Sequence, residues 1–133
     1  MVDTHSPKVN IIYENKGKAD LMEISQETVN SVVVIAPKGR LDVTTTPEIE
    51  KTFAQLFEQN KEKILVDCTS LDYISSAGLR ALLTAAKSAK KINGKIALSC
   101  LNKNVKQIFE ISGFTSIFDI FDARDAGIKA LEN

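Results

Sequence analysis

The alternation of short apolar runs with helical patterns restricts the fold of this chain more than any other feature. Apolar runs at 63–68, 95–100 and 116–121 are each followed by a pattern with helical spacing, at 76–92, 102–114 and 122–133. A strand that returns to its neighbour through a helix of this kind runs parallel to it, because the chain must cross back over the sheet. The sequence therefore predicts an α/β domain.

The first half of the chain adds an antiparallel pair and one helix. The segments "LMEISQE" (21–27) and "SVVVIAPKGR" (31–40) have strand patterns and are joined by a short connection, which predicts a hairpin. In "LDVTTTPEIEKTFAQLFEQNKEK", Thr45 or Thr46 is expected to cap a helix, and Pro47 suits its first turn. The apolar face of this helix comprises Ile49, Phe53, Leu56 and Phe57.

The predicted order is ββαβαβαβα, a mixed and mostly parallel sheet of about five strands with about four helices. We expect one domain over 21–133. Residues 1–20 are mainly polar and contain one apolar cluster, "VNIIY" (9–13). They predict a flexible N-terminal extension that adds at most a transient edge strand.

Charge and hydropathy argue against nucleic-acid and membrane partners. Acidic and basic residues balance at 17 each, Trp is absent, and no basic stripe is present. No apolar run approaches the ~18 residues that span a bilayer, and the N-terminus lacks the apolar core of a secretory signal. We expect a soluble, cytoplasmic protein.

The scarcity of histidine excludes several kinds of catalytic and metal site. His5 is the only histidine and lies in the polar extension, so the folded part cannot build a Ser–His–Asp triad, a Cys–His pair or a His-containing metal site. A small serine hydrolase would lack its base. Cys68 and Cys100 are expected to be buried thiols rather than a disulfide. No phosphate-binding glycine motif is present, so we expect no enzyme, no cofactor and no metal.

Polar residues follow three predicted strands. Asp42 follows the second strand, Asp67 ends the third, and Ser75, Ser76 and Gly78 open the next helix. Ligand-facing residues of an open α/β sheet gather where strands end and helices begin, so Asp42 and Asp67 are expected near the serines. On these features alone structural roles are favoured, with Asp42 organising a turn and Ser75 or Ser76 capping the helix.

The segments "PKGRLDVTTTPEIE" and "ILVDCTSLDYISSAGLRALLTAAKSAKKINGKIALSCLNKNVKQIFEISGF" resemble the STAS domain, and specifically the bacterial anti-sigma factor antagonists. The similarity runs from about Ser31 to Phe121. It rests on a "GRLD" element, a "VD" strand end, an "SSAGL" turn into a helix, and "V…IFE.SGF". In this family the turn usually reads D-S-S-G-L or D-S-A-G-L, and its first serine is phosphorylated.

The resemblance implies a partner-switching function. Aligning Gly78–Leu79 puts Ser76 at the phosphorylated position, while Ser75 replaces the usual aspartate and removes one negative charge. The unphosphorylated protein would bind an anti-sigma factor serine kinase, phosphorylation would break the complex, and a PP2C-type phosphatase would restore it. The implied partner-binding residues are Asp42, Thr44, Ser75, Ser76, Gly78 and Leu79, with Gly39 and Asp67 supporting the site.

A second role stays open within the same family. STAS domains also serve as non-phosphorylated structural subunits, in lipid-transport ABC complexes or stress-sensing assemblies. Ser76 would then act only as a helix cap and interface residue.

Overall fold

The computed structural model describes residues 9–13 and 22–132. The predicted flexibility of the extension falls mostly on residues outside these ranges. The described elements, in chain order, are β1 (Val9–Tyr13), β2 (Glu23–Val29), β3 (Val32–Leu41), α1 (Thr46–Glu58), β4 (Lys63–Asp67), β5 (Leu71–Ile74), α2 (Ser76–Lys91), β6 (Lys95–Ser99), α3 (Lys103–Ile111), the 3-10 helix η1 (Phe114–Ser116), β7 (Asp119–Phe121) and α4 (Arg124–Glu132).

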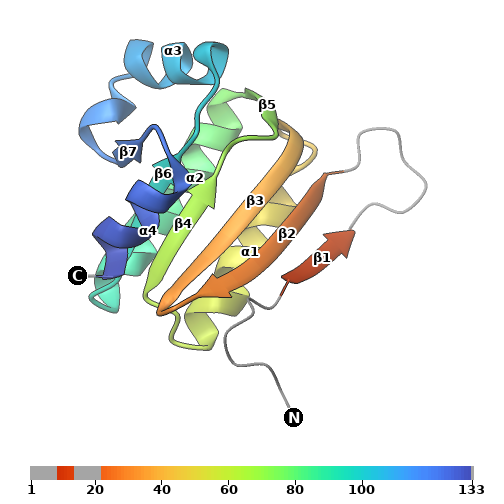
Figure 1. The fold of residues 1–133 in the computed structure, drawn as a ribbon. Coiled ribbons are helices and arrows are strands. Elements are labelled where there is room, and N and C mark those ends of the chain that lie inside the picture. The colour runs from red at the N-terminus through yellow and green to blue at the C-terminus, as the bar shows by residue number, and fades with distance from the viewer. Residues whose placement is uncertain (1–8, 14–21, 133) are drawn as a thin grey trace.

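The strands form one mixed sheet in the order β1-β2-β3-β4-β6-β7, with β5 paired to β3 off this path (Figure 1). The first two pairings are antiparallel, and β3–β4, β4–β6 and β6–β7 are parallel. The predicted α/β class and mostly parallel sheet are confirmed. The sheet exceeds the predicted five strands because "VNIIY" pairs with β2 at the edge and because the short β5 adds to β3.

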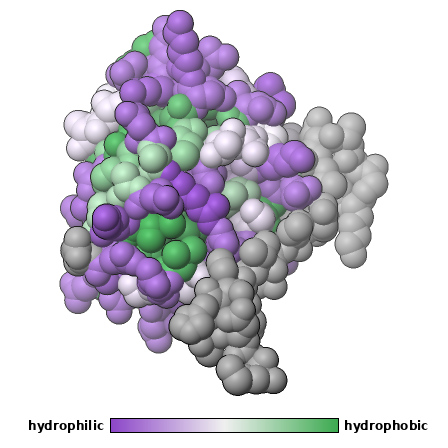
Figure 2. All heavy atoms as spheres, in the orientation of Figure 1, coloured by the Kyte–Doolittle hydropathy of each residue, from purple (hydrophilic) through white to green (hydrophobic). Residues whose placement is uncertain are grey.

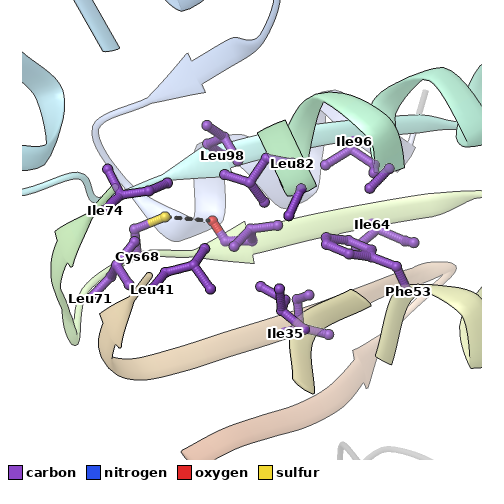
Figure 3. Packing of buried hydrophobic residues seen from close by; sticks show 14 of the residues in the cluster. Ile35, Leu41, Phe53, Ile64, Cys68, Leu71, Ile74, Leu82, Ile96 and Leu98 are labelled. Carbon is purple, nitrogen blue, oxygen red and sulfur yellow. Dashed lines mark hydrogen bonds between the residues drawn. The ribbon is translucent and has the colours of Figure 1, made fainter. Parts of the chain in front are cut away.

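Helices cover both faces of the sheet, because side chains alternate between the two faces along each strand. α1 and α2 pack on one face, where Ile35, Phe53, Ile64, Leu82 and Leu98 belong to the larger core (Figure 3). α4 packs on the other face over a smaller apolar cluster, which consists of Val32, Val34, Leu65, Ala97, Ile128 and Leu131. Beside α4, a hollow of about 580 Å³ lies against the β2–β3 turn, and Figure 2 shows apolar residues among polar ones on this face.

The region after α3 differs from the prediction. Gly113 takes the expected left-handed conformation, with φ of 79°, but the predicted strand over 116–121 is reduced to β7 and preceded by η1. Aromatic packing explains the difference. The ring of Phe109 lies edge-on to Phe114 and Phe118, at centroid distances of 6.4 and 6.1 Å. These contacts hold the chain in a tight turn before β7 can begin.

Both cysteines are free thiols, as predicted, although only Cys68 is fully buried and Cys100 is half-buried. Burial raises the pKa of the Cys68 thiol far above its ordinary value. Within the described ranges, no helix is long and apolar enough to cross a membrane.

Candidate functional site

The site begins where β3 changes its parallel partner. β3 pairs with β4 over Val33–Ile35 and then with β5 over Gly39–Leu41. The change occurs at an irregularity beside Gly39, whose φ of 109° favours glycine and whose N–H donates to the Ser70 carbonyl at 3.0 Å. Gly39 thus has a physical reason for its predicted supporting role. It lets β3 and β5 end side by side (Figure 1).

Leu41 joins the two loops that follow these strands. It lies opposite Ile74 in the β3–β5 pair, and its carbonyl accepts a 2.9 Å hydrogen bond from the Ser75 N–H. Figure 3 shows Leu41, Leu71 and Ile74 gathered at one end of the core. The loop after β3 and the start of α2 therefore lie side by side above the same buried residues. This places Asp42 on a loop adjacent to the serines, as predicted.

Gly78 and Leu79, in the first turn of α2, are buried. A Cβ on Gly78 would lie 2.8 Å from the Leu41 carbonyl oxygen and 2.7 Å from Ile74 Cγ1. Leu79 is 6% exposed and belongs to the core. Both residues were predicted to touch a partner, but here they support the surface from beneath and present no side chain on it.

The two serines have different environments. The Ser75 hydroxyl caps α2 by accepting a hydrogen bond from the Gly78 N–H at 3.2 Å. Ser76 is the first residue of the helix and is exposed, and no described residue hydrogen-bonds its hydroxyl. N–H groups in a first helical turn lack acceptors within the helix, and they favour negative charge nearby. Ser75 thus performs the structural capping role that the sequence allowed for either serine.

The loop after β3 holds a carboxylate in place. Asp42 Oδ1 accepts hydrogen bonds from the Thr44 hydroxyl at 2.7 Å and the Thr44 N–H at 3.0 Å, and Arg40 Nε lies 3.7 Å from Oδ2. The Thr44 hydroxyl, ahead of smaller contributions that include Arg40, lowers the pKa of Asp42 below its ordinary value. Asp42 is therefore a fixed negative charge at neutral pH.

A buried threonine stiffens the same loop. Thr45 occupies the N-cap position of α1, as one of the two predicted alternatives. However, its hydroxyl makes no capping bond to the helix. It donates to the Arg40 carbonyl at 2.7 Å and accepts from the Asp42 N–H at 2.9 Å. The side chain between Asp42 and Thr44, Val43, is 73% exposed on this stiffened loop.

Asp67 lies apart from the serine turn. Its carboxylate accepts hydrogen bonds from the Thr69 N–H at 3.1 Å and the Thr69 hydroxyl at 2.6 Å, and Arg124 of α4 lies 3.8 Å away. Arg124 also pairs with Glu27 of β2. No hydrogen bond or ion pair in the described part of the chain joins Asp67 to Ser75 or Ser76. Alternation along β4 explains this: Asp67 follows Leu65 on the α4 face, whereas α2 covers the opposite face.

The sequence did not predict a cation–π contact beside the site. The guanidinium of Arg40 lies 4.3 Å from the centroid of the Tyr73 ring, across the β3–β5 pair. Tyr73 belongs to a strand of only four residues, "LDYI", which the sequence presents as part of the approach to α2. Its alternation of apolar and polar residues was the available signal for a strand.

The comparisons with known sequences agree with this architecture. The STAS domain family matches residues 23–127. BtrV of Bordetella bronchiseptica, named as a candidate anti-sigma factor antagonist, is 31% identical over 111 residues, which cover 84% of this chain and 96% of BtrV. The anti-sigma-B factor antagonist of Bacillus subtilis is 26% identical over 91 residues, covering 68% of this chain and 83% of that protein.

Solved structures share the fold. The anti-sigma factor antagonist SpoIIAA in its unphosphorylated form aligns with a TM-score of 0.71 at 21% identity, covering 82% of this chain and 96% of SpoIIAA. The phosphorylated form of the Bacillus SpoIIAA aligns with a TM-score of 0.64 at 19% identity, covering 80% of this chain and 97% of that protein. Because the family match spans most of the described residues and BtrV is similar over nearly its full length, this chain is a STAS domain protein of the anti-sigma factor antagonist family.

Proposed function

We propose that this protein is an anti-sigma factor antagonist that binds an anti-sigma factor serine kinase and is switched off by phosphorylation of Ser76. A PP2C-type phosphatase restores the active form. The names of BtrV, the B. subtilis relative and SpoIIAA support the antagonist role, and SpoIIAA is described in phosphorylated and unphosphorylated forms. In this proposal the protein works in the cytoplasm as a ligand and a substrate, and it catalyses no reaction.

The proposal rests on the different environments of the two serine hydroxyls. A kinase needs an acceptor hydroxyl that it can reach without breaking the fold. The Ser76 hydroxyl is exposed at the start of α2, whereas the Ser75 hydroxyl is occupied as the helix cap. Phosphorylation of Ser75 would change the group that accepts the Gly78 N–H, whereas phosphorylation of Ser76 leaves that capping bond as it is.

The surface around Ser76 explains how one phosphoryl group would break a complex. Asp42 and Thr44 lie on the loop that the hydrogen bond from the Ser75 N–H to the Leu41 carbonyl joins to the start of α2, so we expect a partner that covers Ser76 to contact this loop as well. Phosphoserine adds a charge of about −1.5 to −2 beside it. Desolvating that charge in an interface would cost several kcal/mol, because one ion pair rarely repays the desolvation of its charges. Each ~1.4 kcal/mol lowers affinity tenfold.

The serine that replaces the family's usual aspartate keeps one property and loses another. Serine and aspartate are both good N-cap residues, and Ser75 makes the capping bond. The replacement therefore preserves the start of α2 but removes the negative charge that the family pattern places next to the phosphorylated serine. We propose that this lowers the repulsion that an acidic kinase surface or ATP would meet here.

The test pairs Ser76→Ala with Ser75→Ala. After incubation with a cognate anti-sigma factor kinase and ATP, intact-mass analysis should show one phosphate on the wild type and on Ser75→Ala, and none on Ser76→Ala. Calorimetry should show that phosphorylation weakens kinase binding by at least about a hundredfold, while the melting temperature changes little. Phosphorylation of Ser76→Ala to the wild-type extent, or equal affinity of both forms, would contradict the switch and favour a structural subunit.

A further inference from the structure

We infer that Arg80 is the intramolecular counter-ion of the phosphoryl group on Ser76, an inference that rests on the proposed function. Arg80 lies four residues after Ser76 in α2, and both residues are exposed. The inference assigns a role to a charged side chain that the fold does not otherwise use.

The geometry of the helix brings the two side chains together. Residues at i and i+4 lie on the same helix face, with Cβ atoms about 5–6 Å apart. The Cα–Cβ bonds of a helix tilt toward its N-terminus, so a long side chain covers the turn that precedes its own Cα. From this position an extended Arg80 side chain can reach back over the turn that Ser76 begins.

Arg80 is also available. No ion pair or hydrogen bond within the described part of the chain engages its guanidinium. Arg40, the other arginine beside the site, already lies 3.7 Å from the Asp42 carboxylate and 4.3 Å from the Tyr73 ring centroid. The next exposed cation of α2, Lys87, is a further seven residues along the helix, or about 10 Å.

The chemistry of the pair suits a phosphoryl group. A guanidinium presents parallel N–H donors that match two phosphate oxygens, and it keeps its charge at every physiological pH. Pairing with Arg80 holds the phosphoryl group against α2 and favours its dianion. The other charged side chains on neighbouring elements are Arg40 of β3, Asp42 of the loop after β3, Asp72 of β5, and Glu48 and Lys51 near the start of α1, which packs against α2. Asp42 acts in the opposite direction, because a neighbouring carboxylate disfavours the dianion.

The experiment installs phosphoserine at position 76 during translation, so that no kinase is needed. The second pKa of the phosphate is then measured by ³¹P NMR titration in four backgrounds: the native sequence, Arg80→Gln, Arg80→Lys and Lys87→Gln. We expect Arg80→Gln to raise this pKa by about 0.15–0.4 units. Lys87→Gln, the matched loss of a charge on the same helix, should leave the phosphate pKa unchanged. The phosphate pKa in Arg80→Lys should lie between those of the native sequence and Arg80→Gln.

The controls separate this inference from the proposed function. Arg80 is exposed, so Arg80→Gln should fold normally, which circular dichroism and thermal melts of the unphosphorylated variants will verify. An identical phosphate pKa in the native, Arg80→Gln and Lys87→Gln backgrounds would overturn the counter-ion role, whatever the kinase does. Conversely, a cognate kinase that leaves Ser76 unmodified would refute the proposed switch, but it would not change the phosphate pKa measured by ³¹P NMR.

Discussion

Gly78 shows at the scale of one residue how the serine turn is kept in place. Its Cα approaches the Leu41 carbonyl so closely that a methyl group would lie 2.8 Å from the oxygen and 2.7 Å from Ile74 Cγ1. The oxygen belongs to the backbone of β3, which the pairing with β5 holds in position. A side chain at residue 78 would therefore push α2 away from the sheet and shift Ser76 relative to Asp42.

Replacing Gly78 with alanine tests this packing. We expect Gly78→Ala to lower the free energy of unfolding by about 1–3 kcal/mol, because neither the carbonyl nor the buried Ile74 can move away freely. Gly127→Ala in α4 is the matched control. There the nearest atom, at 2.7 Å, is the Cδ1 end of the Leu65 side chain, and alanine gains about 1 kcal/mol of helix propensity. If denaturant titration shows that both variants lose the same free energy of unfolding, this account is contradicted.

At the scale of elements, β5 is the part that makes the site, and it depends on long-range contacts. It is four residues long and pairs with β3, and Asn102 fixes its start. The side-chain Oδ1 of Asn102 caps α3 by accepting from the Val105 N–H at 2.8 Å, while the side-chain Nδ2 donates to the Leu71 carbonyl at 2.9 Å. One side chain thus links α3 to the strand that leads into the serine turn.

Two substitutions of Asn102 separate its roles. Asn102→Ser keeps a good N-cap but cannot reach Leu71, so we expect it to cost about 1 kcal/mol of stability. Asn102→Ala removes both bonds and should cost about 2 kcal/mol. Hydrogen exchange of the Ser75 amide, which donates to Leu41, should accelerate in both variants. Unchanged Ser75 exchange would show that β5 holds its place without this tether.

The elements also show what the sequence could and could not predict. Periodicity predicted the βαβ units, because apolar spacing follows directly from which face is buried. The run at 71–74 has strand character in the sequence, but the predicted order did not count it as a separate strand, since so short a run becomes one only by pairing with β3. The sequence also left open which serine caps α2. Helix starts shift easily by one residue, and serine caps equally well at either position.

At the scale of the whole molecule, the fold consists of a packed body, residues 22–132, and the edge strand β1. The described core begins at Met22, and each sheet face has its own apolar cluster. Arg124 ties β2 to β4 and α4 through Glu27 and Asp67, so the body is held together across its sheet. β1 pairs with β2 alone, at the edge of the sheet.

Deleting residues 1–20 should therefore leave the body folded. One edge strand of five residues contributes little stability, because all other strands keep their partners and both cores remain. We expect a cooperative thermal transition within about 5 °C of the full chain, and an unchanged affinity for the anti-sigma factor kinase, since Asp42 and Ser76 lie at the ends of β3 and β5. Deleting residues 122–133 is the control. It removes Ile128 and Leu131 from the second core and should abolish cooperative unfolding. A body that melts more than about 10 °C lower without residues 1–20 would show that "VNIIY" is an integral strand of the domain.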